Sequence, residues 1–378
     1  MGKILFVAHV DLKKRNGAGL ATLAYYNAVK SLYGDNVDLM MPKECAFDDS
    51  NNIIKVPRRS VLQAILSGSP HRFKQFLNNY LNENKGVYDV CVLNGGLYSG
   101  DMMKMIHRYG LKIIVIHHNL EREYHIDNKS IFTLKGITPA FVNMLEKKAY
   151  TQADVNCFLT KDDRLLFEKC YGPSLKPVHI LGVFEPVPNN LPFLSGNLEQ
   201  KTIAITGSMD SVQTIRGLND FRDNYLDVIN TSYPDWRLII AGRNPQKVAY
   251  EIVEKAPTLY KVIANPENMD DVTKKASVFL CPTNVGGGLK LRVMDGLRSG
   301  LPVLVHRVSS RGYDSFRGKP FFKVYSDHNT FAKGLKEIVS FCETGISRQD
   351  IQNEYLKIFS FESGCERIKN VFNDLKNS

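Results

Sequence analysis

Two kinds of hydrophobic pattern alternate along the chain. Short apolar runs bounded by polar or glycine-rich residues are typical of buried strands, whereas the stretches between them carry apolar residues every three or four positions, which is typical of helices. Strands that alternate with helices indicate βαβ units and parallel sheets. The runs that predict strands are 3–10, 37–41, 87–93, 112–116, 153–160, 178–182, 202–206, 236–241, 262–264, 276–281, 303–305 and 321–324.

The alternation is interrupted by residues 184–200, which are rich in Pro, Asn and Gly. This composition is typical of an interdomain linker. We therefore predict one α/β domain over 1–183, a second over 201–358 and a last amphipathic helix over 359–378. Further expectations are a polar loop at 43–52 and helices at about 20–32, 60–67, 70–81, 101–109, 131–150, 161–171, 217–230, 270–275, 327–343 and 347–357.

Composition is that of a globular protein without a membrane-spanning segment. Of the 378 residues, 43% are hydrophobic and 23% are charged, as is usual for soluble domains. The longest apolar runs, such as 113–116 and 238–241, are far shorter than the roughly 20 residues of a transmembrane helix, and the N-terminus leads into a strand rather than a secretory signal. The seven cysteines are scattered without Cys-x-x-Cys pairs, so we expect reduced thiols, no structural zinc and a cytoplasmic location.

Positive charge is concentrated in the first half of the chain. The net charge is +10, and residues 51–115 hold nine Lys or Arg against three acids, a local net charge of +6. Such a surface favours an anionic partner. No nucleic-acid motif accompanies it, so the two interpretations are peripheral contact with an anionic membrane and an ordinary solvated basic face.

A glycine-rich segment after a predicted strand is the clearest candidate for chemistry. The glycines at 286–288 follow the strand 276–281, and a helical pattern begins directly after them. Bare backbone N–H groups at such a helix N-terminus attract phosphate, and Lys290, expected in the first turn, adds a positive charge. Asp295 lies farther along the same helix. The alternative is an ordinary strand-to-helix turn with Lys290 and Asp295 on the surface.

A second cluster follows the predicted strand 112–116. His117 and His118 come directly after it, with Glu121 and Tyr124 a few residues later, and strand ends of this kind are where α/β folds bind ligands. Adjacent residues of an extended chain point to opposite sides, so we do not expect both histidines to bind one metal ion. The pair is a catalytic candidate, and a structural histidine pair is the alternative.

The order of these residues resembles the nucleotide-binding signature of GT-B glycosyltransferases, especially the retaining enzymes of family 4. The resemblance is carried by 286–305, by Gly-Ser-Met-Asp at 207–210, by His-Asn-x-Glu beginning at His118, and by the first glycine loop. In that family a Glu usually stands where this chain has Asp295 and binds the donor ribose, and a second Glu often stands where this chain has Gly287. The resemblance implies two Rossmann-like domains facing across a cleft, with the last helix crossing back to the first domain.

The resemblance also implies roles for single residues. His118, or His117 if the alignment slips by one residue, stabilises the transferred sugar as it becomes oxocarbenium-like, and Lys290 offsets the charge that grows on the diphosphate. Arg243 pairs with the donor phosphates or is a surface arginine. The residues implied to bind the nucleotide-sugar are Gly17, Gly19, Gly207, Ser208, Arg243, Gly286, Gly287, Gly288, Leu289, Lys290 and Asp295.

The implied reaction transfers a sugar from a UDP- or GDP-linked donor to a hydroxyl of a saccharide or lipid-linked acceptor, with retention. No cofactor or metal ion is implied, because no predicted strand ends in the Asp-x-Asp of metal-dependent enzymes. Basic charge and the resemblance together suggest bacterial surface polysaccharide synthesis at the inner face of the plasma membrane. The alternatives are a catalytically silent protein that binds sugar or a partner transferase, which Gly287 and the shorter Asp295 would suit, and an epimerase or phosphorylase of similar architecture.

Overall fold

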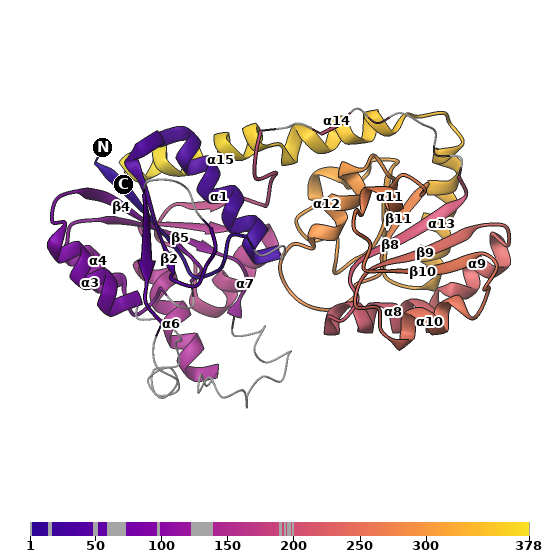
Figure 1. The fold of residues 1–378 in the computed structure, drawn as a ribbon, viewed down its shortest axis with the longest axis horizontal. Helices are drawn as coiled ribbons and strands as arrows, with labels where there is room; N and C mark the ends of the chain where they lie inside the picture. Colours follow the sequence, from indigo (N-terminus) through magenta and orange to yellow (C-terminus); the bar gives the residue numbers. More distant parts are fainter. Residues whose placement is uncertain are drawn as a thin grey trace. The chain divides into compact units, whose positions relative to one another are not determined.

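The chain consists of two compact units. A computed structural model describes residues 2–13, 17–47, 52–58, 73–96, 99–121, 139–188, 191–192, 194, 198 and 200–377. The first unit comprises Met1–Asn189 and Phe359–Ser378, and the second comprises Asn190–Ile358. Each unit has its own sheet (Figure 1).

The first unit contains a seven-stranded parallel sheet in the order β3-β2-β1-β4-β5-β6-β7. Its central strands are apolar and buried almost throughout, as a parallel sheet covered on both faces requires. The strands are β1 (Lys3–Ala8), β2 (Val37–Pro42), β3 (Ile53–Val56), β4 (Tyr88–Asn94), β5 (Lys112–His117), β6 (Val155–Phe158) and β7 (Val178–Ile180). The helices are α1 (Gly17–Tyr33), η1 (Gly34–Asn36), α3 (Phe73–Glu83), α4 (Met103–Arg108), α6 (Pro139–Gln152), α7 (Lys161–Tyr171) and α15 (Phe361–Asn377).

The second unit contains a six-stranded parallel sheet in the order β10-β9-β8-β11-β12-β13. Its strands are β8 (Thr202–Ser208), β9 (Arg237–Arg243), β10 (Tyr260–Ala264), β11 (Val278–Cys281), β12 (Val303–His306) and β13 (Phe322–Tyr325). The helices are α8 (Val212–Asn224), α9 (Leu226–Ser232), α10 (Lys247–Val253), α11 (Asp270–Thr273), α12 (Leu291–Arg298), η3 (Asp314–Phe316), α13 (His328–Cys342) and α14 (Arg348–Phe359).

The strand order reverses once in each sheet. In the first unit the reversal lies between β1 and β4, and in the second it lies between β8 and β11. Helices that follow the two strands at a reversal leave on opposite faces of the sheet, so ligands of open α/β sheets bind at the carboxyl ends of those strands. The candidate residues of each unit are therefore best sought at its reversal point.

The last helix, α15, packs on the first unit beside α1 (Figure 1). The Phe372 ring of α15 lies 4.8 Å, centroid to centroid, from the Tyr33 ring of α1. Apolar residues spaced three or four apart give the helix one buried face. This face is formed by Ile368, Val371, Phe372 and Leu375.

The predicted fold class, two Rossmann-like α/β domains, is confirmed, and each predicted strand is present. One local prediction was wrong, and two elements were missed. The single helix expected at 217–230 is two helices, α8 and α9, that meet at Tyr225. The strand β3, directly after the predicted loop at 43–52, and the helix α10 were not predicted. The helix expected at 60–67 lies outside the described residues. Among the described helices, none is both long and apolar enough to cross a membrane.

Candidate functional site

The carboxyl ends of β8 and β11 lie side by side in the second sheet, and each leads to a helix N-terminus. Ser211 caps α8 by accepting a hydrogen bond from the Thr214 amide at 3.2 Å. Lys290 is the N-cap residue of α12, one position before the first turn where we predicted it, and its side chain makes no capping bond. The first amides of α12 therefore lack a side-chain cap and suit an anionic ligand.

Arg292 lies across the end of β8. Its Nη2 donates a hydrogen bond to the Ser208 carbonyl at 3.3 Å. Gly207 has a φ of 137°, and a Cβ at this position would lie 2.2 Å from Nε of Arg292, so the backbone and the guanidinium both require glycine here. Burial lowers the pKa of Arg292, and the neighbouring Cys281 and Asp295 oppose this shift. The result is a half-buried cation at the sheet edge.

Lys290 connects the glycine loop to α8. Its Nζ donates to the Gly287 carbonyl at 2.7 Å and to Oε1 of Gln213 at 3.1 Å. Gln213 lies in the first turn of α8, and a Cβ on Gly286, whose φ is 91°, would lie 2.3 Å from its Nε2. The N-termini of α8 and α12 are thus joined through one lysine side chain.

Two buried hydroxyl groups from the segment after β12 fix the same loop. The Tyr313 hydroxyl donates to the Lys290 carbonyl at 2.7 Å, and the Ser309 hydroxyl donates to the Thr283 carbonyl at 2.6 Å. Both side chains are fully buried. Nothing in the local sequence pattern marked Tyr313, Ser309 or Arg292, because their roles depend on partners distant along the chain.

Asp295 and Arg243 occupy different parts of this edge. Asp295 lies on α12 one turn beyond Arg292 and is half-buried, and its charge contributes to raising the pKa of Tyr313, which burial raises most. Arg243 ends β9 and is exposed, with Nη2 3.8 Å from Oδ1 of Asp210. Asp210 also accepts a hydrogen bond from Asn244 at 3.1 Å, which lowers the pKa of its carboxyl. Arg243 is therefore an exposed cation at the rim, with only a long ion pair to Asp210.

The first unit has a chain of polar contacts at its own reversal point. Nε2 of His118 lies 2.8 Å from Oδ1 of Asn94, at the end of β4. Nδ2 of Asn94 donates to the Thr22 hydroxyl at 2.6 Å, and this hydroxyl donates to the Ala18 carbonyl at 2.7 Å. Gly17 and Gly19 lie in the first turn of α1 rather than in the loop where we placed them. The polar contacts connect His118 to the Ala18 carbonyl, which lies between these two glycines.

The two histidines have different surroundings, which the sequence left open. His117 is 1% exposed; its ring stacks on Phe158 with centroids 5.0 Å apart, and its Nε2 lies 2.9 Å from Oδ1 of Asn156. Burial lowers the pKa of His117 to about 4. His118 is half-buried, and burial likewise lowers its pKa to about 4. Both are neutral at physiological pH, and His118 is the one with a surface-accessible ring.

Glu121 lies just beyond the histidines and has an unusual environment. Its amide donates to Oε1 of Glu146 at 2.8 Å, and Oε2 of Glu146 accepts a hydrogen bond from the Tyr171 hydroxyl at 2.9 Å. Burial, together with the Glu146 charge, raises the pKa of Glu121 to about 7. Tyr124, the other residue of this predicted cluster, lies outside the described residues.

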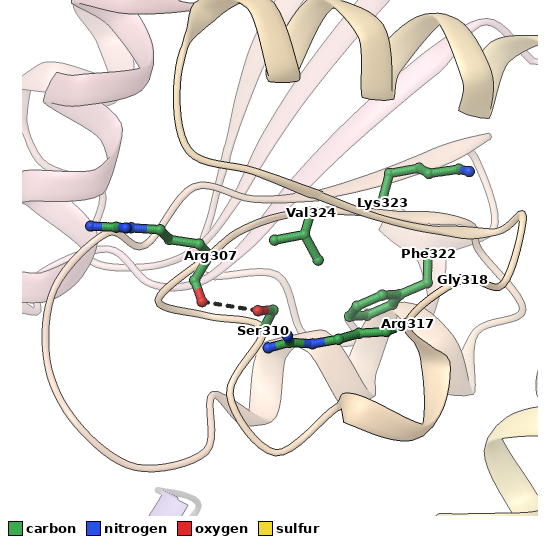
Figure 2. A pocket seen from close by; sticks show the side chains of 7 residues that line it. All are labelled: Arg307, Ser310, Arg317, Gly318, Phe322, Lys323 and Val324. Atoms are coloured by element: carbon green, nitrogen blue, oxygen red, sulfur yellow. Dashed lines mark hydrogen bonds between the residues drawn. The ribbon is translucent and has the colours of Figure 1, made fainter. Parts of the chain in front are cut away.

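A hollow of about 400 Å³ lies beside the edge strand β13. Figure 2 shows the side chains of Arg307 and Lys323 extending toward opposite sides of it. Nζ of Lys323 pairs with Glu337 at 2.7 Å, and Nε of Arg317 pairs with Asp314 at 3.0 Å. None of the predicted site residues lines this hollow, whose lining is formed by Arg307, Ser310, Arg317, Gly318, Phe322, Lys323 and Val324.

The segment that carries the glycine loop, Lys290, Arg292 and Asp295 has known relatives. Residues 200–340 match the family described as glycosyl transferases group 1. This stretch is a glycosyl transferases group 1 domain. It includes both helix N-termini and all of the contacts of Lys290 and Arg292 described above.

A curated protein is similar to part of the chain. An uncharacterized 44.6 kDa protein in the cps region of Klebsiella pneumoniae is 25% identical over 221 residues, which are 52% of this chain and 54% of that protein. The matched region thus spans about half the length of this curated relative.

Solved structures show that the whole chain has the GT-B fold of glycosyltransferases. The lipopolysaccharide outer core galactosyltransferase WaaB is 12% identical, with 98% of this chain and 99% of that chain covered and a TM-score of 0.69. Anabaena Alr3699/HepE in complex with UDP is 9% identical, with coverage of 98% and 99% and a TM-score of 0.64.

Proposed function

We propose that the chain is a glycosyltransferase that moves a sugar from a UDP- or GDP-linked donor to a hydroxyl of a saccharide or lipid-linked acceptor. The observation that carries the proposal is the edge of the second sheet. There, within a glycosyl transferases group 1 domain, the uncapped N-terminus of α12 lies with two cations, Lys290 and Arg292. Converging amides and cations are what a diphosphate requires.

Each group at this edge has a role in the proposed reaction. The α12 amides and the two cations stabilise the charge that develops on the leaving diphosphate. Asp295, one turn further along the helix, binds the donor ribose, and Arg243 makes a weaker contact at the rim. In the first unit, His118 lies beside the transferred sugar. We propose retention of configuration and no requirement for a metal ion, in line with the family resemblance.

A role in bacterial surface polysaccharide or glycoconjugate synthesis is part of the proposal. It is supported by the relative from the cps region of Klebsiella pneumoniae and by the fold shared with a lipopolysaccharide outer core galactosyltransferase. A surface-bound acceptor would bring the basic first half of the chain to an anionic membrane. Vesicle flotation with and without anionic lipid measures that contact directly.

Nucleotide binding is the first test. UDP, GDP, ADP and CMP are compared by thermal shift on the parent protein, on Asp295→Ala and on a control, Asp227→Ala, which removes an exposed carboxylate on α9 that pairs with His328. A nucleotide at about 100 times its Kd stabilises the protein by about 2.7 kcal/mol. We expect one nucleotide to stabilise the parent and the control but not Asp295→Ala.

No stabilisation by any nucleotide would refute the proposed function and favour a silent GT-B protein. Equal stabilisation of all three proteins would refute only the ribose role of Asp295. Transfer from the donor identified in this way is then measured with saccharide acceptors before and after chelator treatment. Activity that disappears with chelator and returns with Mg²⁺ or Mn²⁺ would contradict the metal-independent mechanism, and the anomeric configuration of the product tests retention.

A further inference from the structure

The polar chain behind His118 has a fixed direction. The Ala18 carbonyl can only accept, so the Thr22 hydroxyl donates its single hydrogen there, at 2.7 Å. The Thr22 oxygen is then an acceptor for Asn94, and the atom of Asn94 that faces it at 2.6 Å must be the amide nitrogen. Each bond therefore sets the direction of the next.

The same reasoning reaches the imidazole ring. With its nitrogen facing Thr22, Asn94 presents Oδ1 to Nε2 of His118 at 2.8 Å. An oxygen acceptor at this distance requires the hydrogen on Nε2. In a neutral ring Nδ1 then carries the lone pair, and no described residue forms a hydrogen bond to it.

The three residues that form these polar contacts come from three separate elements of the first unit. Thr22 lies on α1 and is 0% exposed, and Asn94 ends β4 and is 3% exposed. His118 directly follows β5 and is half-buried, so its ring joins this buried chain to the surface. Tyr25 of α1 lies edge-on to the His118 ring with centroids 6.2 Å apart.

We propose that Asn94 and Thr22 are positioning residues that hold neutral His118 in its Nε2–H tautomer, so that Nδ1 accepts a hydrogen bond from a substrate hydroxyl. This inference rests on the proposed function. A lone pair suits this role because the transferred sugar becomes positively charged in the transition state, and an imidazolium would repel it. The substrate group recognised here is an uncharged hydroxyl, in contrast to the diphosphate at the second unit.

The tautomer is measured directly, without substrate. The two nitrogens of a neutral imidazole have distinct ¹⁵N shifts, so ¹⁵N-histidine labelling with His118→Gln as the assignment control identifies the protonated nitrogen. We expect Nε2–H for His118 in the parent protein. A ring protonated on Nδ1 would overturn the proposal, whether or not the protein transfers sugar.

The matched variants are Thr22→Val, which removes the hydroxyl at nearly constant volume, and Thr22→Ser, which keeps it. Thr22→Val removes the oxygen that accepts the hydrogen bond from Asn94, so both tautomers of His118 should be populated. We expect kcat to fall roughly tenfold, the equivalent of one hydrogen bond, with nucleotide affinity unchanged. Thr22→Ser should keep the parental tautomer and rate. Asn94→Leu is the second variant if Thr22→Val does not fold; it removes both the acceptor of the Nε2 hydrogen of His118 and the donor to Thr22 at similar volume, and we expect the same loss.

The outcomes separate this inference from the proposed function. If His118→Ala slows transfer while Thr22→Val and Asn94→Leu keep the parental tautomer and kcat, the positioning role is wrong and the function stands. If His118→Ala transfers sugar at the parental rate, the catalytic role of His118 is wrong, and with it the purpose proposed for the two positioning residues.

Discussion

Replacing Gly207 with alanine tests the geometry of the second unit. A new Cβ would lie 2.2 Å from Nε and 2.4 Å from Cζ of Arg292, and the φ of 137° is one that L-residues rarely adopt. The guanidinium must therefore move away from the Ser208 carbonyl, while the backbone at 207 is strained or rearranges. Both effects act at the end of β8.

The expected loss of stability follows from these two terms. A backbone held in a rare conformation costs roughly 1–3 kcal/mol. A hydrogen bond from a charged donor contributes roughly 1.5–3 kcal/mol, but this one is long, at 3.3 Å, and half-exposed, so we assign it the lower end or less. We expect Gly207→Ala to lower the free energy of unfolding by roughly 2–4 kcal/mol.

The assay uses the single tryptophan of the chain. Trp236 lies in the second unit, directly before β9, and is 6% exposed, so its fluorescence during urea unfolding reports on that unit. The control is Gly287→Ala, because nothing lies within 4 Å of a Cβ there, and we expect a change within about 0.5 kcal/mol. Gly207→Ala should also reduce nucleotide-induced stabilisation, because it displaces Arg292.

Equal stability of the two alanine variants would refute the close approach of Arg292 to Gly207. If Gly207→Ala is destabilised but binds nucleotide as the parent does, the contact is structural, and Arg292 does not bind the diphosphate.

Two further predictions concern buried polar groups. Tyr313→Phe removes the hydrogen bond to the Lys290 carbonyl, so it should lower the free energy of unfolding by about 1–2 kcal/mol and weaken nucleotide binding. Tyr325→Phe is the control, because its buried hydroxyl has no partner among the described residues. Equal losses of stability in the two variants would contradict the role assigned to Tyr313. Burial lowers the pKa of His117 to about 4, below the value of about 6.5 in an unfolded chain. The unfolded state therefore binds more protons than the folded state between these two values. The free energy of unfolding should fall by about 3 kcal/mol as the pH drops from about 6.5 to 4. Urea unfolding followed by circular dichroism across this range should show a smaller fall for His117→Gln, and an identical fall would refute the assignment.

Most of the fold could be predicted because burial on both faces of a parallel sheet leaves a strong signal in the sequence. The runs around β4, β5 and β11 are almost entirely apolar, and their lengths distinguish them from helices. β3 was missed because it is an edge strand of four residues, only partly buried, and contains Lys55. Lys55 bonds to the Cys45 and Phe47 carbonyls, contacts that no periodicity reveals.

The candidate site was only partly predictable for a related reason. Lys290 and Asp295 belong to one local segment whose glycine pattern is visible in the sequence. Arg292 lies in the same segment, but its importance depends on Ser208, 84 positions earlier. The choice between His117 and His118 likewise depends on which asparagine each ring meets, Asn156 within β6 or Asn94 at the end of β4.

The two reversal points differ in chemistry, and this difference limits what each can bind. At β8 and β11 the groups near the helix N-termini are cations and bare amides, which suit a diphosphate. The polar chain at the end of β4 consists of an amide, a hydroxyl and a neutral imidazole, which form directional hydrogen bonds. A nucleotide-sugar has both kinds of group in one molecule, a doubly charged diphosphate and an uncharged hexose. Each reversal point can therefore be tested by itself: anion binding at the second unit should weaken as salt rises, whereas hydrogen bonding to an uncharged hydroxyl at the first unit should depend little on salt.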